Sequence, residues 1–181
     1  MNTQTVIFAG GCFWCVEHDL KSLPGVINAI SGYSGGTTDH PTYHDHGNHR
    51  EAVLVTYDPM QTGFKKLCQF FLDHIDPTDA DGQFYDRGES YRTAIYYKNE
   101  NEKLIAESLI QELQESGLYP NETIAVQVLP ETVFYPAEEY HQDYAEKNSA
   151  HYNSYAKGSG RVTFVANTCA VREQKKINWK D

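Results

Sequence analysis

The strongest structural signal in the chain is the stretch VIFAGGCFWCVEHDLKSL, residues 6–23. Its first four residues are apolar, which predicts a short buried strand over residues 6–9. Gly10 and Gly11 then interrupt the strand and allow the chain to turn sharply. Apolar residues spaced three or four apart follow, and they predict a helix with one buried face over residues 12–22. The chain therefore begins with a strand that passes through a tight turn into a helix.

The rest of the chain alternates between strand-like and helix-like patterns. Strands are predicted at residues 26–30, 52–57, 91–97 and 123–129, and helices at residues 63–75, 99–117 and 137–148. Two long polar segments, residues 31–50 and 76–90, are predicted as loops, and loops of that length in a compact domain are usually functional. This order of elements favours an α+β fold, a two-layer α/β sandwich with a mixed sheet.

The composition is typical of one globular domain, because 40% of the 181 residues are hydrophobic and 22% are charged. The net charge of −10 argues against nucleic acids and anionic membranes as partners, since both are themselves negative. The N-terminus lacks a signal-peptide pattern, and no stretch approaches the length of a membrane span. Four cysteines in a chain of this length do not indicate a disulfide framework. We therefore expect a cytoplasmic protein with reduced thiols.

Two of the cysteines, Cys12 and Cys15, form a C-x-x-C motif at the start of the first predicted helix. At that position the free N–H groups and the positive end of the helix dipole favour an anion, which predicts a nucleophilic thiolate at Cys12. Cys15 lies on the same side of the helix, within disulfide reach. Such a pair is either half of a zinc site or a redox dithiol. Because Cys68 and Cys169 are single and supply no second pair, the redox interpretation is favoured.

From Cys12 onward the sequence resembles the type A peptide methionine sulfoxide reductases. The resemblance rests on five motifs in family order: GCFW at 11–14, PTY at 41–43, HREAV at 49–53, DRGESYRTAIY at 86–96 and EEYHQDY at 138–144. It implies a ferredoxin-like core and a catalytic domain over residues 1–160, followed by a C-terminal extension, 161–181. That extension carries the basic residues Arg172, Lys175, Lys176 and Lys180, and we expect its end to be mobile.

The resemblance implies thiol-dependent reduction of the S epimer of methionine sulfoxide, free or in proteins, to methionine. A sulfoxide offers an electrophilic sulfur, a polar oxygen and a methyl group, so its reduction needs a nucleophile, an acid and an apolar slot. Cys12 would attack the sulfur. Glu51 would protonate the oxygen, since partial burial beside Ala52 and Val53 raises the pKa of a carboxyl group. By likeness to the family, Tyr43 and Tyr91 would stabilise the oxygen, Phe13 and Trp14 would hold the methyl group, and Asp86 would contact substrate or reductant.

The reaction leaves a sulfenic acid on Cys12, which condenses readily with a second thiol. The chain departs from the commonest family pattern here, because Cys15 stands where the family often has glycine. We expect Cys15 to resolve the sulfenic acid, with Cys169 as the alternative. The disulfide would then be reduced by thioredoxin or a similar dithiol. The resemblance further implies a monomer that needs no cofactor and no metal. A second departure is the shortened segment at residues 44–50, whose path is therefore open.

Two other functions stay possible at this level. The first is a metal-binding module built from His40, His44, His46 and His49 with Asp39 and Asp45, although a solvated polar loop explains the same residues. The second is a general dithiol oxidoreductase that uses Cys12 and Cys15, although thioredoxin-like proteins place a tryptophan before the first cysteine rather than between the two. We expect His141 and Tyr144 to be structural supports, and Cys68 to be core packing.

Overall fold

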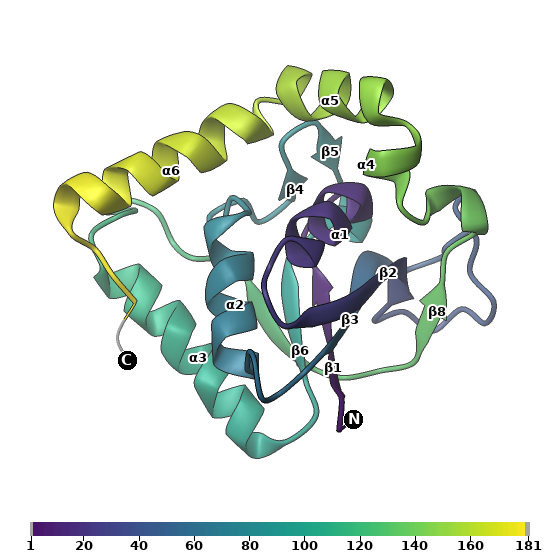
Figure 1. Ribbon diagram of the computed structural model, residues 1–181, viewed down its shortest axis with the longest axis horizontal. Helices are drawn as coiled ribbons and strands as arrows, with labels where there is room; N and C mark the ends of the chain where they lie inside the picture. The colour runs from purple at the N-terminus through teal and green to yellow at the C-terminus, as the bar shows by residue number, and fades with distance from the viewer. Residues whose placement is uncertain (1, 180–181) are drawn as a thin grey trace.

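The structure is a computed structural model that describes residues 2–179 (Figure 1). Its centre is a six-stranded sheet in the order β7-β6-β1-β3-β2-β8. The strands are β1 (Gln4–Ala9), β2 (Val26–Ser34), β3 (Arg50–Tyr57), β6 (Ala94–Tyr97), β7 (Gln127–Pro130) and β8 (Phe134–Pro136). All neighbours are antiparallel except β6 and β7, which are parallel. The predicted α+β architecture with a mixed sheet is therefore confirmed.

The helices are α1 (Phe13–Lys21), α2 (Phe64–Asp73), α3 (Glu100–Glu115), α4 (Tyr144–Lys147), α5 (Ser149–Gly158) and α6 (Arg161–Lys175). Figure 1 shows α1 and α2 across one face of the sheet, with α3 beside α2 and with α5 and α6 along one end. Within residues 2–179, no helix combines the length and the apolar character that crossing a bilayer requires.

The main core lies between the sheet and these helices. Phe8 pairs in register with Val53 on β3 and with Ile95 on β6, and all three side chains are fully buried. The ring of Phe8 stacks on Phe71 of α2 at a centroid distance of 4.7 Å. Cys68 of α2 belongs to the same core and has no exposed surface, so the prediction of a packing role for this cysteine is confirmed.

The predicted helix start at Asn99 is also confirmed. The Asn99 side chain accepts a hydrogen bond from the backbone N–H of Glu102 at 3.0 Å. The Glu102 carboxylate accepts one from the backbone N–H of Lys98 at 2.7 Å. Both ends of a capping box are thus present, with the return bond displaced by one residue from its usual donor.

Four predicted elements differ from the structure by more than two residues. The strand predicted over 91–97 begins only at Ala94, because Glu89–Tyr91 form a 3₁₀ turn. Residues 31–34, predicted as loop, extend β2 because β3 pairs with them up to Ser34 and Arg50. The strand predicted over 123–129 begins only at Gln127, since the N–H groups of Ile124 and Ala125 bond to Gln114 and Pro77 instead of to a strand.

The helix predicted over 137–148 is interrupted. A 3₁₀ turn spans Glu139–His141 and α4 spans Tyr144–Lys147, with Asp143 between them in the left-handed conformation (φ 56°). The backbone N–H of Asp143 donates to the buried carboxylate of Glu17 at 3.0 Å. This tertiary bond accounts for the interruption, because it orients the chain away from a continuous helix at that residue.

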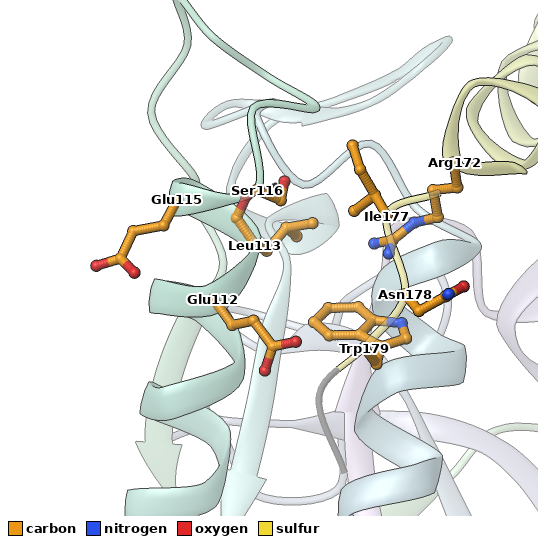
Figure 2. Close-up of a pocket in the computed structure, with 8 residues that line it drawn as sticks. All are labelled: Glu112, Leu113, Glu115, Ser116, Arg172, Ile177, Asn178 and Trp179. Atoms are coloured by element: carbon orange, nitrogen blue, oxygen red, sulfur yellow. Dashed lines mark hydrogen bonds between the residues drawn. The ribbon is translucent and has the colours of Figure 1, made fainter. Parts of the chain in front are cut away.

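The expected extension over 161–181 consists of α6 followed by a segment that runs to Trp179. Arg172 pairs with Asp73 of α2 at 2.8 Å, and the Trp179 indole N–H donates to the same carboxylate at 3.0 Å. A cavity of about 200 Å³ lies between this segment and the end of α3 (Figure 2). Lys180, which was counted with the basic end of the chain, lies outside the described residues.

Candidate active site

The two glycines before Cys12 are required by close packing. Gly11 has φ +80°, and a Cβ at this residue would lie 2.5 Å from the Cβ of Gln83. A Cβ on Gly10 would lie 2.7 Å from the ring of Phe71. The resulting turn places Cys12 at the N-cap of α1, where its carbonyl oxygen accepts from the N–H of Cys15 at 3.1 Å. The predicted strand, turn and helix are therefore confirmed at this position.

Glu51 lies on β3 next to the start of α1. Its side chain is 3% exposed, and its Oε2 accepts a 2.9 Å hydrogen bond from the backbone N–H of Phe13. The hydroxyl of Tyr91 acts on the same carboxyl group and lowers its pKa. Burial raises the pKa of Glu51 to about 8, against the Phe13 N–H and the Tyr91 hydroxyl, which lower it. The raised pKa predicted from the sequence is confirmed in direction, and the group is mostly protonated at neutral pH.

Cys12 differs from the sequence prediction in its acidity. Burial raises its pKa well above the ordinary value, and the thiol of Cys15 and the charges of Glu51 and Asp86 raise it further. The thiol is 9% exposed. The predicted easy ionisation of Cys12 is therefore wrong for the free protein, because burial and two carboxyl groups outweigh the helix start. Ionisation of Cys12 must be coupled to substrate binding or to proton transfer within the site.

Two tyrosines and an aspartate complete the polar side of the site. Tyr43, Tyr91 and Asp86 are half-buried. Burial raises the pKa of both phenols, and the charge of Glu51 raises it further, so both hydroxyls keep their protons and can donate. Asp86 belongs to the short hairpin of β4 (Gly82–Gln83) and β5 (Asp86–Arg87), and its charge acts on Cys12. The structure thus brings these predicted residues together around Cys12.

Phe13 and Trp14 form the aromatic side of the site. The Phe13 ring is 1% exposed, with its centroid 6.4 Å from that of Tyr43 and 5.1 Å from that of His141. Trp14 is half-buried and stacks on Tyr144 at a centroid distance of 3.8 Å. Its indole N–H donates to Nδ1 of His141 at 3.1 Å. His141 and Tyr144 therefore support Trp14, as the sequence predicts.

Three residues near the site were missed by the sequence analysis, and all lie in the region that was left unassigned after residue 148. Tyr155 of α5 donates its hydroxyl to Asp86 and places its ring edge-on to Trp14 at 6.2 Å. Tyr152 of α5 and Arg161 of α6 lie against Cys15. No local signal identifies them, because the chain has 13 tyrosines and these contacts join segments at least 69 residues apart.

The two candidates for the second thiol lie in different surroundings. The side chains of Cys12 and Cys15 pack in one buried cluster, and each thiol affects the acidity of the other. Cys169 is exposed on α6, and the charged groups that act on it are Asp73, Arg172 and Glu173.

The histidine-rich loop does not form a metal site. His49 is 2% exposed, and its ring uses both nitrogens within the loop, Nδ1 accepting from Gly36 N–H at 3.1 Å and Nε2 donating to Thr38 O at 2.7 Å. His46 stacks on Tyr33 at 6.0 Å. Over the described range 2–179, no three His, Cys, Asp or Glu side chains are placed to hold a metal ion. The metal-binding alternative is therefore not supported.

Comparison with known proteins agrees with the geometry. A family model described as peptide methionine sulfoxide reductase matches residues 4–173. The peptide methionine sulfoxide reductase MsrA of Bacillus licheniformis is 48% identical over 166 residues, which cover 90% of this chain and 91% of that protein. The solved structure of methionine sulfoxide reductase A of Corynebacterium diphtheriae has a TM-score of 0.71 at 34% identity, covering 81% of this chain and 76% of its own. Reduced Mxr1 from Saccharomyces cerevisiae has a TM-score of 0.74 at 29% identity, covering 81% and 86%.

Proposed function

The chain belongs to the peptide methionine sulfoxide reductase family, and from that premise we propose that it reduces the S epimer of methionine sulfoxide to methionine with Cys12 as the nucleophile. The observation that carries the proposal is the protonated, buried carboxyl group of Glu51, held by the N–H of the residue that follows Cys12. A sulfoxide is reduced more easily when its oxygen is protonated as the sulfur is attacked. Cys12 and Glu51 supply those two functions side by side.

In the first step the oxygen atom passes from the substrate sulfur to the sulfur of Cys12. The Cys12 thiol becomes a sulfenic acid and the sulfoxide becomes methionine, so the protons balance without an external donor. Glu51 donates its proton to the oxygen while the S–O bond of the substrate weakens, and it recovers a proton from the thiol. The phenols of Tyr43 and Tyr91 donate to the same oxygen as its charge develops.

The aromatic residues give the site its apolar slot. The side chain of Trp14 is held by two contacts: its ring stacks on Tyr144, and its indole N–H donates to His141. A fixed indole beside the nucleophile can hold a methyl group without losing conformational freedom on binding. The ring of Phe13 is more deeply buried, and its centroid lies 6.3 Å from that of Trp14. Asp86 accepts a hydrogen bond from the hydroxyl of Tyr155.

We further propose that Cys15 resolves the sulfenic acid of Cys12. Its support is the direct side-chain contact between the two thiols, compared with the separate surroundings of Cys169. The resulting disulfide would be reduced by a thioredoxin-type dithiol. Such a reductant suits a protein that works in a reducing compartment such as the cytoplasm. All proposed site residues come from one chain, which suits a monomer.

The test of the reaction is one turnover without reductant. The reduced protein is mixed with a peptide that contains the S epimer, and methionine is measured by chromatography. We expect about one equivalent of methionine from the wild-type protein and from Cys169→Ser, and none from Cys12→Ser. Equal conversion of the R epimer would contradict the proposed stereochemistry, and full activity of Cys12→Ser would contradict the assigned nucleophile.

A further inference from the structure

The side chain of Cys15 is buried between α1 and α5. Its side chain is 1% exposed and packs with Tyr152 and Ala156 of α5. The ring of Tyr152, which is itself 6% exposed, packs in the same cluster as Cys15, and its hydroxyl favours the ionised form of the Cys15 thiol. Tyr152 therefore lies beside the sulfur that would carry the charge.

A buried positive charge lies on the other side of the same thiol. Arg161, the first residue of α6, is 7% exposed. Its guanidinium pairs with the carboxylate of Asp19 and donates to the carbonyl oxygen of His74 at 2.6 Å. Asp19 lies one helical turn after Cys15 on α1, so this pair fixes the guanidinium beside Cys15, where its charge acts on the sulfur.

The two thiols of the pair are therefore in unequal surroundings. The pKa of Cys15 lies below its ordinary value because the thiol of Cys12 donates to it, with Arg161 and Tyr152 acting in the same direction against burial and Asp19. The pKa of Cys12 is raised. The ionisable groups that face Cys15 are Cys12, Asp19, Glu51, Tyr152, Tyr155 and Arg161.

Tyr152 and Arg161 are among the largest influences on the acidity of Cys15. Building on the proposed function, we propose that Tyr152 and Arg161 are positioning residues that hold Cys15 as the attacking thiolate of the disulfide-forming step. The two C-terminal helices would thereby contribute to the chemistry from a fixed position, with no movement of the chain end.

The step balances as follows. The thiolate of Cys15 attacks the sulfur of the Cys12 sulfenic acid, an S–S bond forms, and the S–O bond breaks. The leaving hydroxide takes a proton from Glu51 and departs as water, and the proton released when the Cys15 thiol ionises restores Glu51. Cys12 is reduced from the sulfenic to the disulfide level while Cys15 is oxidised to the same level. When an incoming dithiol later attacks the disulfide at Cys12, Cys15 leaves as the stabilised thiolate.

The expected effect of removing the Tyr152 hydroxyl on the rate of disulfide formation follows from general thiol chemistry. Removing a hydrogen bond to a charged group lowers the thiolate fraction about tenfold at neutral pH. The intrinsic nucleophilicity rises about threefold in compensation, because it increases with pKa. Disulfide formation in Tyr152→Phe should therefore be about threefold slower at pH 7, and its pH profile should move up by about one pH unit.

The experiment follows methionine and disulfide separately in one turnover of the reduced full-length protein with an S-epimer sulfoxide peptide. Samples are quenched with a dimedone-type probe that captures sulfenic acid, and the disulfide is quantified by peptide mapping. Tyr152→Phe should form methionine at the wild-type rate but accumulate trapped sulfenic acid. Arg161→Gln should show a larger delay of the same kind. Tyr57→Phe is the matched control, because it removes a buried hydroxyl bonded to Gln4 at 2.8 Å, away from the thiols.

Should Arg161→Gln fail to fold, Tyr152→Phe decides the question alone. Wild-type disulfide rates and an unmoved pH profile in Tyr152→Phe would overturn the role. A wild-type protein that yields methionine but no disulfide to Cys15 would also overturn it, while leaving the reductase activity intact. No methionine from the wild-type protein would instead overturn the proposed function itself, and this role with it.

Discussion

The backbone N–H of Phe13 donates a 2.9 Å hydrogen bond to Oε2 of Glu51. Phe13 directly follows Cys12, so this bond fixes the acid relative to the nucleophile through the backbone of α1. Glu51 lies opposite Tyr33 in the register of β3 and β2, two adjacent strands of the central sheet. The geometry of the pair therefore depends on a paired strand and on the start of a helix rather than on a loop.

Removing the acid should slow the first step. Glu51→Gln keeps the shape of the side chain and its ability to accept from Phe13, but it cannot release a proton. We expect the rate of methionine formation in one turnover to fall about 100-fold or more, the usual contribution of a positioned acid. Rapid-quench measurement of the methionine burst would check this.

The same carboxyl group sets the basic limb of the pH profile. Because the protonated form is active and its pKa is about 8, the burst rate of the wild-type protein should fall as the pH rises through about 8. A burst rate that continues to rise up to pH 9.5 would contradict the assignment of Glu51 as the acid.

Glu51 should also make stability depend on pH. Its pKa is about 8 in the folded protein, above the ordinary value of 4.5, so the folded state binds more protons than the unfolded state between these values. Stability is thus fully present below about pH 4.5 and falls as pH rises towards 8. The loss from this group between pH 5 and 8 amounts to up to about 4 kcal/mol.

Urea unfolding of the wild-type protein and Glu51→Gln at pH 5.5 and pH 8 tests this linkage. The variant lacks the titrating group, so its stability relative to the wild-type protein should increase with pH. An equal pH dependence in both proteins would show that Glu51 is not protonated on folding.

The glycine turn before Cys12 should tolerate no side chain at Gly11. Gly11→Ala places a Cβ 2.5 Å from that of Gln83 at a positive φ, so we expect a loss of stability of about 2 kcal/mol or more. Gly158→Ala is the matched control, since a Cβ there meets no atom within 4 Å and the residue ends α5. It should be neutral or stabilising by up to about 1 kcal/mol. Thermal unfolding of both variants compares them directly, and equal midpoints would refute the steric argument.

The reductant should attack the disulfide at Cys12 rather than at Cys15. Cys12 is 9% exposed and Cys15 is 1% exposed, and Cys15 is the better leaving thiolate. A thioredoxin whose second active-site cysteine is replaced by serine should therefore form a stable mixed disulfide with the oxidised protein. Peptide mapping should locate it on Cys12, and a mixed disulfide mainly on Cys15 would show that the helices open before reduction.

Local patterns in the sequence were sufficient for much of the fold. The strand, turn and helix around Cys12 follow from apolar spacing and two glycines, and Asn99 identifies the start of α3 through its capping group. The predicted strand and helix boundaries that were wrong depend on hydrogen bonds to residues distant in the sequence. Residues 123–126 lose their predicted strand because Gln114 and Pro77 take up backbone N–H groups there.

The candidate site likewise contains features that local sequence predicts and features that depend on distant contacts. Cys12, Glu51 and the two tyrosines were found through motifs in family order, and the structure brings them together. The acidity of Cys12 could not be predicted, because it depends on burial and on carboxyl groups from β3 and β5. Tyr152, Tyr155 and Arg161 escaped notice because their importance comes only from contacts made across the fold.

The most direct test of the proposed chemistry is to map the disulfide formed by the wild-type protein after one turnover with an S-epimer sulfoxide peptide, in the absence of any reductant. We expect one equivalent of methionine and a single new bond between Cys12 and Cys15, with Cys68 and Cys169 still reduced. A bond from Cys12 to Cys169, or four intact thiols with no methionine formed, would contradict this chemistry.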